Sequence, residues 1–270
     1  MRLILFTGIV LFSLLPFWAK TQQVYFSAVT YEDTVLTNSF IGTLDLQTCD
    51  TTLITTSIEY SSLTFDSNGQ LYGLRRDSIF QISLANGASS YIADFGLYDD
   101  FENVVTSGIV LVNNTLFVLF AFPAYNLGKY NINSGEKSLV DPTWSDLSPL
   151  GPTGLSVRNG QLIAANWAGG IYALDTTNIF NKQLLFPHPD FEPFSNGIAT
   201  IPISCDSSRT FINNLYYLNT PELEDIFEVN FQTQTLELVC SLDFIVAGLC
   251  FYEESLPPPC AITLDADADN

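Results

Sequence analysis

Apolar residues along this chain follow a pattern that repeats roughly every 43 to 51 residues. Four of the repeats open on a glycine followed by Ile or Leu, and every repeat continues with short segments in which apolar and polar residues alternate. Asn, Gly, Ser and Asp separate these segments, as in the turns of β-hairpins. The opening glycines are Gly108, Gly154, Gly197 and Gly248. A repeat of this length, with four short strands, is typical of a β-propeller blade.

The segment 63–95 is the clearest repeat. It predicts strands at 63–66, 71–74, 79–84 and 90–95. The following repeats predict strands at 108–111, 116–119, 127–132, 138–140, 154–157, 162–165, 171–175, 182–186, 197–200, 215–218, 226–231 and 236–240. We expect an insertion from Ser204 to Phe211 in the last of these repeats.

The two ends of the chain together supply one more blade. Segments 24–28, 40–45 and 52–55 predict the second, third and outermost strands of a blade that lacks its innermost strand. Segment 248–252 predicts an innermost strand without partners. Pairing 248–252 with 24–28 would close the ring and remove exposed sheet edges. The expected fold class is therefore an all-β, five-bladed β-propeller over residues 23–254, closed by pairing of the N- and C-terminal segments in one blade.

The sequence F-D-x-x-G-x-L-Y at Phe65 to Tyr72 and the strand rhythm from Gln22 to Glu254 resemble secreted bacterial propellers related to the NHL and SMP-30/lactonase-like groups. The resemblance implies the fold more than an activity, because this phrase marks the turn and core of a blade. Lactonase-type propellers hold a divalent metal with Glu, Asn and Asp on innermost strands. The innermost strands predicted here offer mainly Ile, Leu, Val, Thr and Ala, so those ligands cannot be assigned.

The first 22 residues predict a secretory signal peptide. Met1 and Arg2 precede an apolar run from Leu3 to Leu15, and Ala19 follows as a small residue. This run is shorter than the roughly 20 residues that a membrane-spanning helix requires. We therefore expect a secreted or cell-surface protein whose mature chain has no membrane span.

The balance of charge excludes one class of partner. Acidic residues number 29 against 9 basic ones, which gives a formal net charge of −20. Nucleic-acid binding depends on Lys and Arg to neutralise phosphates, so it is not expected. The acidic surface keeps a secreted chain soluble, and the expected partner is a protein or a glycan.

In a propeller, the connections between the second and third strands of a blade, and from one blade to the next, emerge on one face. We call this the connection face. Aromatic and acidic residues in these loops can stack on sugar rings or form a protein-binding patch; alternatively, the aromatics hold the loops onto the blades. The candidate ligand-binding residues are Tyr98, Asp99, Trp144, Asp146, Trp167 and Phe191.

The favoured function is a non-catalytic binding or adhesion module that uses this face. The alternative is a secreted hydrolase of the glycosidase or lactonase type with its site at the mouth of the central channel. That alternative needs converging carboxylates, for which Asp66 and Asp146 are candidates. No residue is assigned as catalytic.

Five cysteines in an exported chain allow a disulfide. We expect Cys49 to bond to Cys260, because the innermost strand of the closing blade runs towards the face where the turn containing Cys49 lies. Cys205 is the competing partner. Cys240 and Cys250 lie within predicted strands and are expected to be buried thiols.

The C-terminal segment 255–270 is a proline-rich linker followed by an acidic tail. It resembles the opening strand of sandwich repeats in large bacterial surface proteins, which implies that the propeller is the first domain of a longer protein. The alternating Asp265, Asp267 and Asp269 are candidate ligands for Ca²⁺, the one cofactor considered. The glycine and final glutamate of an EF-hand are missing, so a disordered acidic end is the other interpretation.

Overall fold

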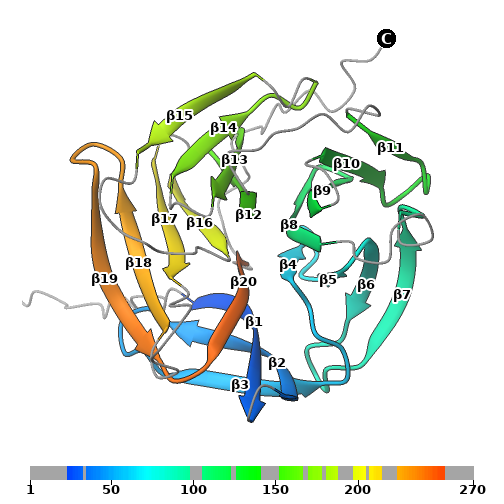
Figure 1. Ribbon diagram of the computed structural model, residues 1–270, viewed down its shortest axis with the longest axis horizontal. Coiled ribbons are helices and arrows are strands. Elements are labelled where there is room, and N and C mark those ends of the chain that lie inside the picture. The colour runs from blue at the N-terminus through cyan, green and yellow to red at the C-terminus, as the bar shows by residue number, and fades with distance from the viewer. Residues whose placement is uncertain are drawn as a thin grey trace, which may run out of the picture.

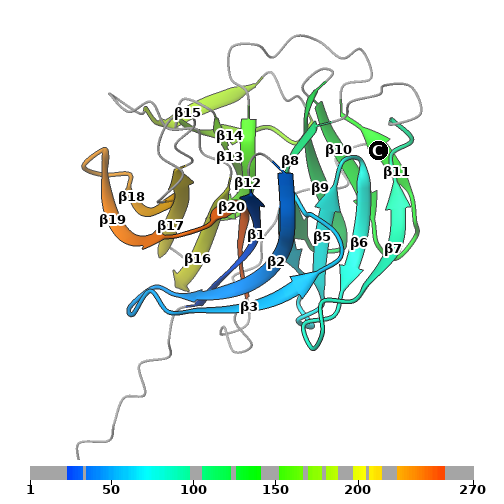
Figure 2. The same cartoon turned by 60° about the horizontal axis from the view of Figure 1, so that its bottom comes forward.

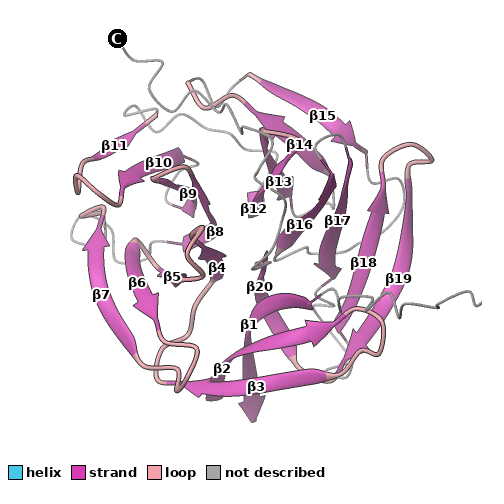
Figure 3. Cartoon of the chain, turned by 180° about the vertical axis from the view of Figure 1, so that it is seen from behind, coloured by secondary structure: helices cyan, strands magenta, loops and turns pink. Residues whose placement is uncertain are grey.

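The computed structural model describes residues 23–32, 35–97, 105–122, 126–140, 152–166, 170–177, 181–187, 197–204, 207–214 and 224–252. Within these ranges the chain forms 20 strands in five antiparallel sheets of four strands each. The sheets are arranged as blades around a central axis, as Figure 1 shows from one side and Figure 3 from behind. The predicted five-bladed propeller is confirmed. The segments 1–22 and 255–270 lie outside the described residues, so the signal peptide and the acidic tail stay predictions.

We number the blades in chain order and give their strands from the innermost outwards. Blade 1 contains β20 (Ile245–Phe251), β1 (Gln23–Glu32), β2 (Val35–Asp45) and β3 (Thr51–Thr56). Blade 2 contains β4 (Ser62–Phe65), β5 (Leu71–Arg75), β6 (Ser78–Ile82) and β7 (Ser89–Asp94). Blade 3 contains β8 (Val105–Val112), β9 (Thr115–Phe122), β10 (Asn126–Asn131) and β11 (Lys137–Leu139).

The last two blades have the same strand order. Blade 4 contains β12 (Pro152–Arg158), β13 (Gln161–Asn166), β14 (Ile171–Leu174) and β15 (Lys182–Phe186). Blade 5 contains β16 (Ile198–Ser204), β17 (Ser207–Asn214), β18 (Glu224–Asn230) and β19 (Thr235–Leu242). The apolar alternation therefore located most strands to within a few residues.

The two ends of the described chain meet in blade 1. Strand β20 pairs antiparallel with β1, with Phe26 opposite Leu249 and Ser27 opposite Gly248. Figure 2 shows β20 and β1 side by side near the centre of the view. The prediction that the N- and C-terminal segments share a blade is confirmed.

The repeated glycines have a packing role at the central axis. A Cβ at Gly108 would lie 2.5 Å from Cβ of Leu155, and one at Gly154 would lie 2.9 Å from N of Ile198. The other two meet the neighbouring innermost strand in the same way, Gly197 at β20 and Gly248 at β4. Each innermost strand can approach the next this closely only because the glycine has no side chain.

Blade 2 has Ser62 at the position that glycine occupies in the other repeats. Its hydroxyl accepts a hydrogen bond from Ile109 N of β8 at 3.2 Å, and Thr64 accepts one from Leu111 N at 3.1 Å. These hydroxyls thus satisfy edge amides of the adjacent innermost strand. The ring of innermost strands is held by backbone contact at four junctions and by hydroxyl groups at the fifth.

Blade 5 differs from its prediction in the position of one strand. Its second strand is β17, Ser207–Asn214, rather than 215–218. The segment expected as an insertion thus contains much of the strand, and 215–218 lies outside the described residues. The polar start of β17 concealed it, because Arg209 sits within the sheet and pairs with Glu228 of β18, 2.7 Å from Nε to Oε1.

The predicted disulfide between Cys49 and Cys260 is wrong. Cys49 bonds to Cys240 of β19, with their Cα atoms 5.6 Å apart. The prediction considered cysteines that follow the end of an innermost strand, but the outermost strand of blade 5 passes the turn that contains Cys49. Cys240 is buried within its strand and faces this turn. The expectation of a buried thiol is therefore wrong for Cys240 and confirmed for Cys250, which is free and buried. Cys205 and Cys260 lie outside the described residues.

Candidate functional site

The structure places a cleft on the connection face of blade 2. It has a volume of about 220 Å³ and lies between the β5–β6 turn and the end of β7. Its last residue, Gly96, precedes the predicted site residue Tyr98 by two positions. The lining residues are Arg75, Arg76, Asp77, Ser78, Phe80, Asp94 and Gly96.

The six ligand-binding residues predicted from the sequence cannot be placed against this cleft. They lie outside the described residues, as do the candidate calcium ligands Asp265, Asp267 and Asp269. The unplaced ligand-binding residues are Tyr98, Asp99, Trp144, Asp146, Trp167 and Phe191. Their roles stay predictions.

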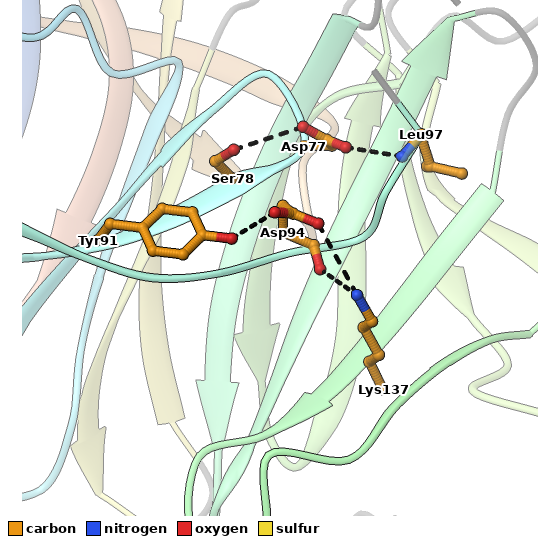
Figure 4. Close-up of polar contacts among 6 residues, drawn as sticks. All are labelled: Asp77, Ser78, Tyr91, Asp94, Leu97 and Lys137. Atoms are coloured by element: carbon orange, nitrogen blue, oxygen red, sulfur yellow. Dashed lines mark hydrogen bonds and ion pairs between the residues drawn. The ribbon is translucent and has the colours of Figure 1, made fainter. Parts of the chain in front are cut away.

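Asp77 fixes one wall of the cleft. It is 3% exposed, and its Oδ2 accepts a hydrogen bond from Leu97 N at 2.8 Å, while its carbonyl accepts one from Phe95 N at 3.1 Å. Figure 4 shows this carboxylate between Ser78 and Leu97. Arg76, directly before it, has a φ of 54°, which completes the tight turn. The buried carboxylate and the carbonyl of Asp77, each accepting from a backbone amide, hold the turn to the segment after β7.

Asp94 forms the other side and connects blade 2 to blade 3. It accepts a hydrogen bond from the Tyr91 hydroxyl, and this bond raises the pKa of Tyr91 to about 12. Lys137 of β11 donates to the Asp94 carbonyl at 2.8 Å, and its Nζ lies 3.8 Å from Oδ1. Figure 4 shows Tyr91 and Lys137 reaching Asp94 from opposite sides. Tyr91 therefore stays a hydrogen-bond donor across the physiological pH range.

The sequence contained a signal for this cleft that the repeat pattern concealed. Arg75 and Arg76 are the only consecutive basic residues in a chain with nine Lys and Arg. Arg75 ends β5 and Arg76 lies in the short turn that leads to β6. Residues at such connections commonly bind partners. The predicted site was chosen from aromatic and acidic loop residues, so it did not include Arg75 and Arg76.

The innermost strands provide no comparable acidic site. Their described sequences, SLTF, VTSGIVLV, PTGLSVR, IATIPIS and IVAGLCF, contain neither Asp nor Glu. Across the described part of the chain, no group of three or more His, Cys, Asp or Glu side chains is positioned to bind a metal. A hydrolase site at the axis would need its carboxylates from elsewhere.

A single buried glutamate lies between blades 5 and 1. Glu224, at the start of β18, is 4% exposed and accepts hydrogen bonds from Asn213 Nδ2 and from Val246 N of β20. Asn213 Nδ2 also donates to Val246 O at 2.9 Å. Burial raises the pKa of Glu224 to about 8, against the lowering effect of these two hydrogen bonds. Because it is sealed from solvent, this carboxyl connects blade 5 to the last strand and does not face a ligand.

Comparison with known proteins supports the fold alone. No family model and no curated protein matches the sequence. A protein of unknown function from Bacteroides thetaiotaomicron is similar in structure, with a TM-score of 0.53 and 10% identity. The match covers 81% of this chain and 64% of that one, so this chain spans less than two thirds of that protein.

Two other solved structures show weaker similarity. A protein of unknown function from Bacteroides caccae has a TM-score of 0.42 and 10% identity, over 83% of this chain and 73% of that one. A putative 6-phosphogluconolactonase from Bacteroides uniformis has a TM-score of 0.43 and 11% identity, over 83% of both chains. In the described residues, no helix is both long and apolar enough to cross a membrane.

Proposed function

We propose that this protein is an exported, non-catalytic binding module that holds a protein or glycan ligand on the connection face of its propeller. The observation that carries the proposal is the position of the cleft. It opens on this face beside Arg75 and Asp94, and its lining residue Gly96 precedes Tyr98 by two positions in the sequence. A rigid ring of blades that presents loops on one side is well suited to binding.

The closely packed axis supports binding over catalysis. The innermost strands approach each other at Gly108, Gly154, Gly197 and Gly248, and their described residues are uncharged apart from Arg158. Export is supported by the Cys49–Cys240 disulfide, since such bonds persist in oxidising compartments. The predicted signal peptide at 1–22 fits the same interpretation.

A glycan array probed with the mature chain tests the proposal. We expect selective retention of a subset of glycans, and we expect the Trp144→Ala/Trp167→Ala double variant to lose that retention while its melting temperature stays within a few degrees of the wild type. Unfolding of the double variant together with each single variant would instead identify the tryptophans as loop anchors. An array on which wild-type protein retains nothing would leave only a protein ligand.

Hydrolysis assays distinguish the alternative function. Nitrophenyl glycosides and an aldonolactone are suitable probes of glycosidase and lactonase chemistry. The binding proposal expects no turnover above that of heat-denatured protein. Turnover that disappears in Asp66→Asn or Asp146→Asn would overturn it in favour of a hydrolase.

A further inference from the structure

The outer part of blade 2 presents two rows of side chains on one face of the sheet. Residues directly opposite each other in an antiparallel sheet point to the same side. Arg75 lies opposite Ser78, and Ser78 lies opposite Asp94, which makes a polar row across β5, β6 and β7. Gly73, Phe80 and Tyr91 form the next row in the same way.

The two rows share a face because of a bulge and a glycine. The register between β6 and β7 shifts between Ile79 and Phe80, so Tyr91 and Asp94 both point to this side although they are three positions apart. Their hydrogen bond is direct evidence of this arrangement. At the inner end, a Cβ on Gly73 would lie 2.5 Å from the Tyr60 ring, so the ring occupies that position instead.

The polar row combines a cation with hydrogen-bonding oxygens. Arg75 is exposed, and none of its contacts within the described residues is an ion pair with a carboxylate. The Asp94 charge is partly balanced by Lys137 at 3.8 Å. The distance from the first to the third strand of the row is roughly 10 Å, two inter-strand spacings. A guanidinium at one end of such a row can bind a carboxylate through two hydrogen bonds.

The second row offers an aromatic surface next to these groups. Phe80 is half-buried and lines the cleft, and its ring is edge-on to that of Tyr91, with centroids 5.9 Å apart. Tyr91 is 57% exposed. Aromatic faces of this kind stack on the apolar face of a sugar ring, while Ser78 and Asp94 can hydrogen-bond to its hydroxyl groups.

We propose that this face binds an acidic sugar, a uronic acid unit of a glycan, with its carboxylate on Arg75, its ring against Phe80 and its hydroxyls at Ser78 and Asp94. This inference rests on the proposed binding function and specifies its ligand class. A chain with 29 acidic residues would repel a long polyanion, so the site favours a short or sparsely charged segment.

Calorimetric titration with α-1,4-trigalacturonate and the neutral α-1,4-galactotriose tests the proposal in the full mature chain. We expect wild-type protein to bind trigalacturonate at least tenfold more tightly than galactotriose. Arg75→Gln should weaken trigalacturonate binding at least tenfold and leave galactotriose binding unchanged. Lys182→Gln, which removes one positive charge from blade 4, should change either affinity less than twofold. Phe80→Leu should weaken both.

The outcomes distinguish a failure of the acidic-sugar site from a failure of the proposed binding function. Equal affinity for the two sugars, or no effect of Arg75→Gln in a protein with wild-type melting, overturns the acidic-sugar site. Competition by hexaglutamate as effective as that by trigalacturonate would assign the face to an acidic peptide instead. If the array finds neutral glycans whose retention depends on Trp144 and Trp167, this result would support the proposed binding function and reject the acidic-sugar site.

Discussion

The closing seam and the blade 2 cleft use polar groups in opposite ways. We define the closing seam as β20, β1 and the β2–β3 turn of blade 1 together with the strands of blade 5 that face them. The seam buries Glu224 and contains the Cys49–Cys240 bond, and Phe26, Phe211 and other apolar side chains surround them. At the cleft, Asp94 and its ion-pair partner Lys137 remain 40% and 48% exposed.

The buried groups of the seam hold the ring together, whereas the exposed polar groups of the cleft are accessible to a ligand. Blade 1 joins the two ends of the described chain through the pairing of β20 with β1, and buried side chains and the Cys49–Cys240 disulfide add to this closure. The cleft borders an apolar core between blades 1 and 2, in which its lining residue Phe80 packs with Ile41, Tyr60 and Ile82. Its exposed charges can therefore change with little effect on that core. Four changes test the contrast, beginning with the largest expected effect.

Removal of residues 247–270 should unfold the whole propeller. The truncation deletes most of β20, exposes Val24 and Phe26 of β1, and takes away most partners of the inner edge of blade 1. Circular dichroism should show loss of the cooperative thermal transition. Truncation after Tyr252, which keeps every described strand, is the control and should melt like the full chain. A cooperative transition at the wild-type temperature in the shorter protein would contradict ring closure by β20.

Loss of the disulfide should be the next largest effect. The bond spans 191 residues and ties the N-terminal part of blade 1 to blade 5. Its removal should cost about 2 to 5 kcal/mol in the free energy of unfolding. Cys49→Ser/Cys240→Ser, compared with wild type in urea, measures this cost. Cys250→Ala affects a buried thiol outside the bond and should cost less. Non-reducing peptide maps that join Cys49 to another cysteine would reject the pairing.

The buried Glu224 should make the seam sensitive to pH. The pKa of Glu224 is about 8 in the folded state and about 4.5 when unfolded. Its contribution to the free energy of unfolding is therefore complete below about pH 4.5 and is lost as the pH rises through 8. The wild-type melting temperature should fall over this interval, and Glu224→Gln should flatten the fall. Glu136→Gln, in an exposed turn, controls for the general repulsion of a chain with net charge −20. Parallel curves for Glu224→Gln and wild type would show that this carboxyl is not the source.

The sequence was sufficient for the architecture and insufficient for the site. Local alternation of apolar and polar residues is visible in a single sequence. It was enough to predict the strand spacing, the repeated glycines and the incomplete blades at the two ends. The partner of Cys49 depended on which neighbouring blade passes the turn that contains it. The spacing of cysteines along the sequence does not show this tertiary arrangement. The face shared by Arg75, Phe80 and Tyr91 depended on strand register and on a bulge. Arg209 concealed β17 because a charged residue within a strand disrupts the apolar pattern.

Replacement of Lys137 by Met should have the smallest effect on stability. The Lys137–Asp94 pair is half-exposed, and surface ion pairs of this kind contribute about 0 to 1 kcal/mol. The aliphatic part of the side chain remains, so the melting temperature should fall by no more than about 2 to 4 °C, the shift that 1 kcal/mol gives in a protein of this size. Because the variant leaves Asp94 without its cation, trigalacturonate affinity should fall through repulsion between carboxylates. A loss of stability as large as that of the disulfide variant would show that the rim of blade 2 helps to hold the ring, and the contrast with the seam would fail.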